Sequence, residues 1–89
     1  MKARVFVTLK PSVFDPQGRT ILEALRSLGF ESVNNVRQGK YFELDLNVPT
    51  VAAAEALAAD VADRVLSNPV IESFRLEIVQ ADAVGERRS

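Results

Sequence analysis

The hydrophobic pattern of this chain changes its period several times, and each change marks a boundary between secondary-structure elements. Near the N-terminus apolar and polar residues alternate, with Ala3, Val5, Val7 and Leu9 on one side and Arg4, Phe6, Thr8 and Lys10 on the other. A repeat of two residues is typical of a β-strand that buries one face. After a loop over residues 11–15, the apolar positions Ile21, Leu22, Leu25 and Leu28 follow the spacing of an amphipathic helix. The chain therefore begins with a strand and then a helix.

The helix begins with the sequence Asp15-Pro16-Gln17-Gly18. Asp15 is a good N-cap because its carboxylate can accept hydrogen bonds from the unpaired N–H groups of the first turn. Pro16 suits the first helical position, where a missing N–H costs nothing. Gly18 is unexpected, since glycine in a helix gives up about 1 kcal/mol relative to alanine. Its presence predicts a close approach by another backbone, a partner or a ligand.

The helix is predicted to end at Gly29, a residue suited to a left-handed cap. The following stretch, residues 32–48, has β character. From Tyr41 to Val48 the alternation is clean, and Phe42, Leu44, Leu46 and Val48 are expected to point inward. Between Val33 and Val36 the spacing slips to three residues, which indicates a bulge or a poorly paired edge. Gln38-Gly39 is the natural position for a tight turn that divides the stretch into two strands, and a single long bent strand is the alternative.

A second helix is predicted from Thr50, as its cap, to about Ser67. Its apolar stripe is expected to comprise Ala54, Leu57, Ala58, Val61 and Val65. Asn68-Pro69 ends this helix. Phe74, Leu76 and Ile78 then alternate with polar residues and predict a last strand.

The resulting order is β-α-β-β-α-β, which predicts an α+β, two-layer sandwich of the ferredoxin-like type. In this arrangement an antiparallel sheet carries two helices on one face. Residues 1–80 are expected to form a single domain, and residues 81–89 a disordered C-terminal tail.

Composition excludes several classes of function. The chain of 89 residues has no cysteine and no histidine, which removes thiolate nucleophiles, the usual general base and the commonest metal ligands. Its net charge of −1, with acids and bases interspersed, argues against a nucleic-acid partner. No apolar run reaches membrane-spanning length, and we expect the N-terminus to start directly with a strand instead of a signal peptide. We expect a cytoplasmic domain without a catalytic, cofactor or metal site, and its thin core favours oligomerisation.

The sheet face opposite the helices is the expected site of self-association. It carries two aromatic residues among paired charges, and its central members are Phe6, Thr8, Tyr41, Glu43 and Arg75. A small domain often docks such a face on a second copy, so we expect a homodimer or tetramer.

Other chemistries find little support in the sequence. Asp15 and Glu43 have no histidine to pair with, and a cap and an outward strand position account for them. The loop after the first strand lacks the arginine and glycines of an acylphosphatase site. One glycine at a helix start is a weak signal for anion binding, and the aromatic spacing around Tyr41 does not fit an RNA-recognition motif.

Two loops are candidates for contact with a protein partner. Arg37-Gln38-Gly39-Lys40 is a basic, glycine-containing turn that suits an acidic surface. The helix start from Asp15 to Gly18 is the other. The candidate contact residues are Asp15, Gln17, Gly18, Arg37, Gly39 and Lys40.

Five short segments together resemble one known family. They are Lys10, Asp15-Pro16-Gln17-Gly18, Leu28-Gly29-Phe30, Val36-Arg37-Gln38-Gly39-Lys40 and Asn68-Pro69-Val70-Ile71-Glu72. Their order and spacing resemble PurS, the small subunit of phosphoribosylformylglycinamidine (FGAM) synthase, over about residues 4–80. Gln38 stands where the family more often has an aliphatic residue, and Ser73-Phe74 replaces a more usual acidic residue and tyrosine.

The resemblance implies a non-catalytic subunit in purine biosynthesis. The whole enzyme converts formylglycinamide ribonucleotide to its amidine with ATP and glutamine. In this family a glutaminase subunit, PurQ, makes ammonia, and a large synthetase subunit, PurL, binds ATP and magnesium. PurS binds both as a homodimer or larger oligomer and supports ammonia transfer.

A ligand-sensing regulatory dimer of the ACT type is the alternative, because it shares the same element order. That type usually has a glycine in the loop after the first strand. Here the loop contains Pro11 and the bulky pair Val13-Phe14.

Overall fold

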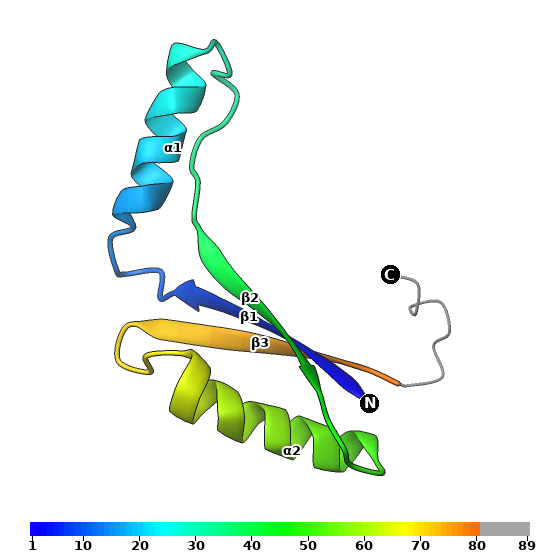
Figure 1. Cartoon of the computed structure of the whole chain (residues 1–89). Coiled ribbons are helices and arrows are strands. Elements are labelled where there is room, and N and C mark those ends of the chain that lie inside the picture. Colours follow the sequence, from blue (N-terminus) through cyan, green and yellow to red (C-terminus); the bar gives the residue numbers. More distant parts are fainter. Residues whose placement is uncertain (81–89) are drawn as a thin grey trace.

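The computed structural model describes residues 1–80, and the tail expected over residues 81–89 lies outside this range. Three strands form one antiparallel sheet in the order β2-β1-β3 (Figure 1). Their bounds are β1 (Lys2–Leu9), β2 (Gly39–Asp45) and β3 (Glu72–Val79). The alternation predicted for the first strand is confirmed, because Ala3, Val5 and Val7 are fully buried.

Two helices lie between the strands in the expected order. Helix α1 (Pro16–Ser27) follows β1, and helix α2 (Val51–Val61) follows β2 and continues into a π-helical turn, η1 (Ala62–Leu66). The α+β class with an antiparallel sheet and two helices is therefore confirmed.

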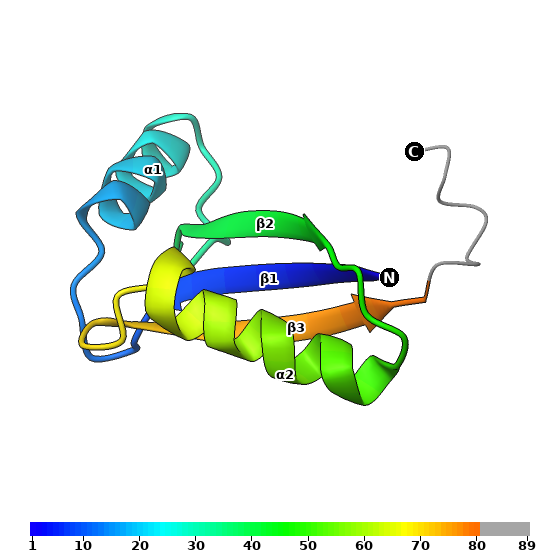
Figure 2. The same cartoon turned by 60° about the horizontal axis from the view of Figure 1, so that its bottom comes forward.

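Helix α2 packs on one face of the sheet, mainly over β1 and β3 (Figure 2). Three alanines spaced four residues apart, Ala54, Ala58 and Ala62, are fully buried there. Their small side chains let the helix lie close to the strands. Leu57 and Val65 were expected in the same stripe but are 39% and 74% exposed. The stripe is narrower than predicted, because of its five expected members Ala54 and Ala58 are buried and Val61 is partly buried.

The end of this helix departs from regular α geometry. The N–H of Ser67 bonds to the carbonyl of Ala62, five residues earlier, at 2.9 Å, and the Ser67 hydroxyl bonds to the same oxygen at 2.9 Å. A π turn contains one residue more than an α turn, so it rotates the following side chains around the axis. A prediction from sequence periodicity assumes a constant number of residues per turn, so it does not account for this rotation.

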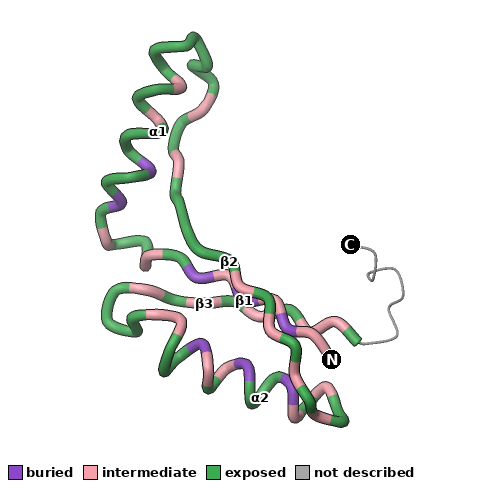
Figure 3. Tube along the Cα trace, in the orientation of Figure 1, coloured by how far each residue is buried: buried purple, intermediate pink, exposed green. Residues whose placement is uncertain are grey.

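Helix α1 does not cover the sheet, which differs from the expectation that both helices share one face. It projects beyond the end of β1, and the chain returns alongside it to enter β2 (Figure 1). We call residues 14–38 the arm. Figure 3 shows that the arm is exposed over most of its length, with buried residues only near its base. The buried positions in the arm are Asp15 and Gly18.

The tight turn predicted at Gln38-Gly39 does not form. The chain passes through this point without reversing, and the ladder with β1 begins at Gly39, which pairs with Thr8 (Figure 1). The returning segment, residues 33–38, belongs to no strand of the sheet. Of the two alternatives, the single long segment without a turn is correct. Only its second half, β2, is hydrogen-bonded to another strand of the sheet. As a result residues 1–80 contain three strands instead of four.

Candidate interaction surfaces

The base of the arm is held by a single carboxylate that bonds to two segments. Oδ1 of Asp15 accepts from the N–H of Gly18 at 2.9 Å, which is the predicted N-cap. Oδ2 accepts from the N–H of Gln38 at 2.7 Å, across 23 residues of sequence. These two backbone bonds, the one from Gln38 first, lower the pKa of Asp15 below its ordinary value of 3.8. Asp15 thus ties the start of α1 to the start of β2.

Gly18 lies where the two sides of the arm touch. A Cβ atom at this position would overlap the carbonyl oxygen of Val36 and would crowd the Asp15 carboxylate. The prediction of a close backbone approach at Gly18 is confirmed, and the approaching backbone belongs to the same chain. Gly18 lowers the helix propensity of α1, but its lack of a side chain allows direct contact between α1 and the returning segment.

Two further side chains fasten this base. The Arg37 guanidinium donates through Nη2 to the carbonyl oxygens of Lys10, at 3.0 Å, and Val13, at 3.1 Å. The Gln38 side chain donates to Oε1 of Gln17 at 2.5 Å. We call the set Asp15, Gly18, Val36, Arg37 and Gln38 the arm junction. Because it connects the loop after β1, helix α1 and the returning segment, it fixes the direction of the arm.

The candidate partner contacts predicted from sequence are brought together here. Asp15 and Gly18 are buried by the chain itself, whereas Gln17, Arg37, Gly39 and Lys40 are exposed. Lys40 forms an ion pair with Glu72 of β3 at 3.4 Å. A hollow of about 180 Å³ lies between these residues, lined among others by Thr8, Gln17, Lys40 and Glu72. Small-molecule sites usually measure about 300–1,000 Å³.

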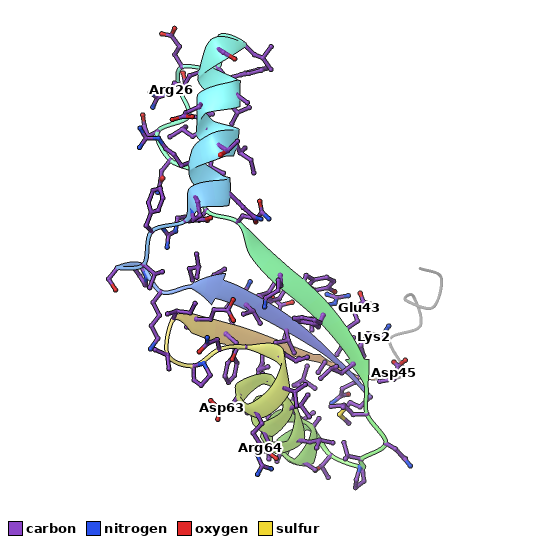
Figure 4. The ribbon with its side chains drawn as sticks, turned by 60° about the vertical axis from the view of Figure 1, so that its left-hand side comes forward. Lys2, Arg26, Glu43, Asp45, Asp63 and Arg64 are labelled. Carbon is purple, nitrogen blue, oxygen red and sulfur yellow. The ribbon has the colours of Figure 1, made fainter. Side chains whose placement is uncertain are left out.

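The far end of the arm is closed by capping bonds. Gly29 adopts a φ of +94°, and the N–H of Phe30 bonds to the carbonyl of Leu25 at 2.9 Å. This Schellman geometry confirms the predicted glycine cap. The Arg26 side chain then reaches across the arm, donating to the Val33 carbonyl through Nε at 3.3 Å and Nη2 at 3.1 Å (Figure 4).

The outer sheet face carries the residues predicted for self-association, and they contact one another. The ring of Phe6 lies 5.1 Å from that of Tyr41, and the guanidinium of Arg75 lies 4.1 Å from the Phe6 centroid. Such an arrangement is stabilising both as an aromatic pair and as a cation–π contact. Thr8 is exposed on the same strand.

Charges on this face are paired within the chain. The Tyr41 hydroxyl donates to Glu43 at 2.7 Å, and this bond raises the pKa of Tyr41 and lowers the pKa of Glu43. Lys2 lies 3.5 Å from Glu43 at the same end of the sheet (Figure 4). Arg75 and Glu77 are 2.8 Å apart. Most charged groups of this face are therefore paired within the chain, although the buried Nε of Arg4 has no hydrogen-bond partner among the described residues.

Sequence reasoning missed a third surface, an apolar line along the arm. Ile21 and Leu28 are seven residues apart and so lie on one side of α1, and Phe14 precedes the start of the helix by two residues. The exposed fractions of Phe14, Ile21 and Leu28 are 68%, 40% and 72%. The signal was present, because Ile21 and Leu28 belong to the predicted apolar stripe of this helix, but the stripe was assigned to the core.

Residues 1–80 contain no helix long and apolar enough to cross a membrane. Within the same range no cluster of three or more acidic, histidine or cysteine side chains is arranged to hold a metal ion.

Comparison with known proteins identifies relatives over nearly the whole described chain. The family model of PurS, phosphoribosylformylglycinamidine (FGAM) synthase, matches residues 2–80. The PurS subunit of that enzyme from Synechocystis is 44% identical over 75 residues, which are 84% of this chain and 75% of the relative.

Solved structures agree with the sequence matches. The crystal structure of Methanocaldococcus jannaschii PurS has a TM-score of 0.82 at 30% identity and covers 90% of this chain and 96% of that one. A chain of the Thermotoga maritima PurLQS structure has a TM-score of 0.80 at 27% identity, with coverage of 88% and 95%.

Proposed function

Because this chain belongs to the PurS family, we propose that it is the small, non-catalytic assembly subunit of FGAM synthase. It joins the synthetase subunit PurL to the glutaminase subunit PurQ and supports transfer of ammonia between them. The observation that carries this proposal is the match of the family model to residues 2–80, together with the related chain in a PurLQS structure.

The side chains of the described residues support a role in binding instead of chemistry. The two acidic residues with lowered pKa values, Asp15 and Glu43, are each engaged in hydrogen bonds that hold the fold. Neither is paired with a histidine or a cysteine, since the chain has no residue of either type. ATP and magnesium are accordingly bound by the large subunit, and this chain acts in the cytoplasm with the rest of the pathway enzyme.

The partner subunits contact the base of the arm. Gln17, Gly39 and Lys40 are exposed there, and Arg37 adds a second positive charge beside them. Asp15 and Gly18 contribute by holding these residues in position, since both are buried. An acidic patch on the larger subunits fits this surface.

The outer face mediates self-association. The proposed patch consists of Phe6, Thr8, Tyr41, Glu43 and Arg75, and its aromatic residues and arginine are of types enriched at protein interfaces. Because most of its charged groups are paired with one another, the face can remain exposed to water before assembly. Phe6→Glu is expected to lower the oligomeric state measured by light scattering while leaving the circular dichroism spectrum unchanged.

Reconstitution with the cognate synthetase and glutaminase subunits tests the proposed function. Glutamine-dependent formation of the amidine should require this chain, whereas turnover with added ammonia should depend on it much less. Equal glutamine-dependent rates with and without the chain would refute the assignment.

A further inference from the structure

The outer edge of β3 has no neighbouring strand within the described part of the chain. The strand order β2-β1-β3 leaves one side of β3 open over its whole length (Figure 2). β1 and β3 keep one antiparallel register from Lys2↔Val79 to Leu9↔Glu72, so no bulge interrupts the strand. The strand also contains no proline. A long and regular edge of this kind can accept a further strand.

The phase of the hydrogen bonds identifies the groups that face this edge. In an antiparallel pair, residues that bond to the neighbouring strand alternate with residues whose N–H and C=O point away from it. The N–H of Lys10 bonds at 2.8 Å to the carbonyl of Ile71, its opposite residue in the same register, so the odd-numbered residues of β3 bond to β1. The N–H of Glu72 accordingly points away and bonds to the Asn68 carbonyl at 2.7 Å. Three residues of the edge therefore direct both backbone groups outward: Phe74, Leu76 and Ile78.

These outward groups are unpaired within residues 1–80. Outside the ladder between β1 and β3, no group in this range bonds to the N–H or C=O of Phe74, Leu76 or Ile78. Their side chains lie on the face that α2 covers and are only partly buried. A strand added beside β3 would pair the backbone groups and bury these side chains further.

Helix α2 and the η1 turn carry excess negative charge next to this edge. Because α2 packs over β1 and β3, a strand added beside β3 lies close to it. The two elements contain three acidic residues, Glu55, Asp60 and Asp63, and one basic residue, Arg64. Arg64 pairs with Asp60 at 3.5 Å. Glu55 and Asp63 have no basic partner among the described residues. Positive charge therefore favours a segment that binds here.

The same charge disfavours a second copy of this chain at the edge. If two copies paired β3 with β3, their α2 helices would lie side by side, because each helix covers its own β3. Both helices are acidic, and like charges at close range oppose the contact. A basic segment of a different protein suits the edge better.

We propose that a larger subunit of the synthase adds an extended, basic segment to the outer edge of β3 as a fourth strand. This choice of partner rests on the proposed function. β3 begins at Glu72, whose carboxylate pairs with Lys40 at the base of the arm. A subunit that contacts the base of the arm therefore reaches the first residues of the edge. The added segment has apolar residues on the helix side and polar residues on the outer side, and its basic residues compensate the charge of α2.

Amide hydrogen exchange, read residue by residue, tests this proposal without any substitution. Isotope-labelled chain is placed in heavy water alone and in complex with the cognate synthetase and glutaminase subunits, and its amides are read by NMR after quenching. In the free chain, β1 should protect the inward amides, those of Ser73, Arg75 and Glu77. The outward amides should exchange rapidly in the free chain and slow roughly tenfold or more in the complex. They are the amides of Phe74, Leu76 and Ile78.

The possible outcomes separate this proposal from the proposed function. If the chain does not join the complex in gel filtration, the proposed function fails, and this partner fails with it. If the chain joins the complex and the outward amides of β3 still exchange rapidly, only strand addition is wrong. Protection already present in the free chain would also overturn the proposal. Its dependence on protein concentration would then distinguish a second copy from a segment of the same chain.

Blocking one outward amide gives a second test. N-methylation of Leu76, introduced by chemical synthesis, keeps the side chain but removes an outward donor and places a methyl group where the added strand would lie. We expect the dissociation constant for the larger subunits to rise roughly tenfold or more.

N-methylation of Asp45 is the matched control, because its amide points away from β1 on the other edge strand, β2. Circular dichroism and urea denaturation establish that both modified chains are folded. Equal affinities of the two modified chains for the larger subunits would contradict strand addition at β3.

Discussion

Gly18 sets the separation between the two sides of the arm, because the carbonyl of Val36 occupies the space that a side chain would need. The sequence predicted both the helix start and an unusual contact at this residue. It did not predict which backbone makes the contact, since Val36 lies 18 residues away and its position depends on the arm as a whole.

Gly18→Ala tests this contact, because helix propensity and the contact with Val36 predict changes of opposite sign in the free energy of unfolding. Helix propensity alone would favour alanine by about 1 kcal/mol. We expect a loss of about 1–3 kcal/mol in the free energy of unfolding instead, because the new methyl group forces the returning segment away. Urea denaturation measures the change. Thr20→Ala, at an exposed position of the same helix, is the control and should not lose stability in this way.

Asp15 makes stability depend on pH. Its pKa is lowered in the fold by the bonds from Gln38 and Gly18, so its contribution is fully present above its ordinary value of 3.8 and is lost as the pH falls through the folded pKa. Asp15→Asn keeps the size of the side chain but removes the charge and leaves one oxygen to accept where the carboxylate has two. In urea denaturation from about pH 7 to about pH 2 the wild-type chain should be more stable at first, and the gap should close below about pH 4. A gap that stays constant over this range would show that the charge of Asp15 plays no part.

At the level of elements, helix α2 depends on small residues. Ala54, Ala58 and Ala62 are fully buried at the sheet, so a larger side chain there must push the helix outward. Ala58→Leu is expected to lower the free energy of unfolding by about 1–3 kcal/mol. Ala52→Leu, on the exposed side of the same helix, is the matched control. Equal effects of the two substitutions would contradict the close approach of α2 to the strands.

The elements themselves were predictable from local pattern, and their placement was only partly so. Period-two alternation located β1, β2 and β3, and caps at Asp15, Gly29 and Thr50 located the helix ends, because these signals act over a few residues. The amphipathic stripe of α1 indicates that one side of the helix is buried. It does not indicate against which surface that side packs. The turn expected at Gln38-Gly39 does not form, because glycine permits a chain reversal without requiring one.

At the scale of the whole molecule, Lys40 lies at the base of the arm, where partner contact is proposed, and also pairs with Glu72. Lys40→Glu should weaken binding to the larger subunits in a pull-down or titration, because it reverses a charge in the proposed contact. The double variant Lys40→Glu/Glu72→Lys restores the internal ion pair with its direction reversed. If partner binding depends on the charge of Lys40, the double variant should also bind weakly. Full recovery in the double variant would assign the effect to the fold alone.

The projecting arm also has a consequence for the behaviour of the isolated chain in concentrated solution. Phe14, Ile21 and Leu28 are 68%, 40% and 72% exposed, and exposed apolar side chains that lie near one another promote aggregation. The same arm that the junction holds away from the sheet therefore makes the chain sticky whenever nothing covers it.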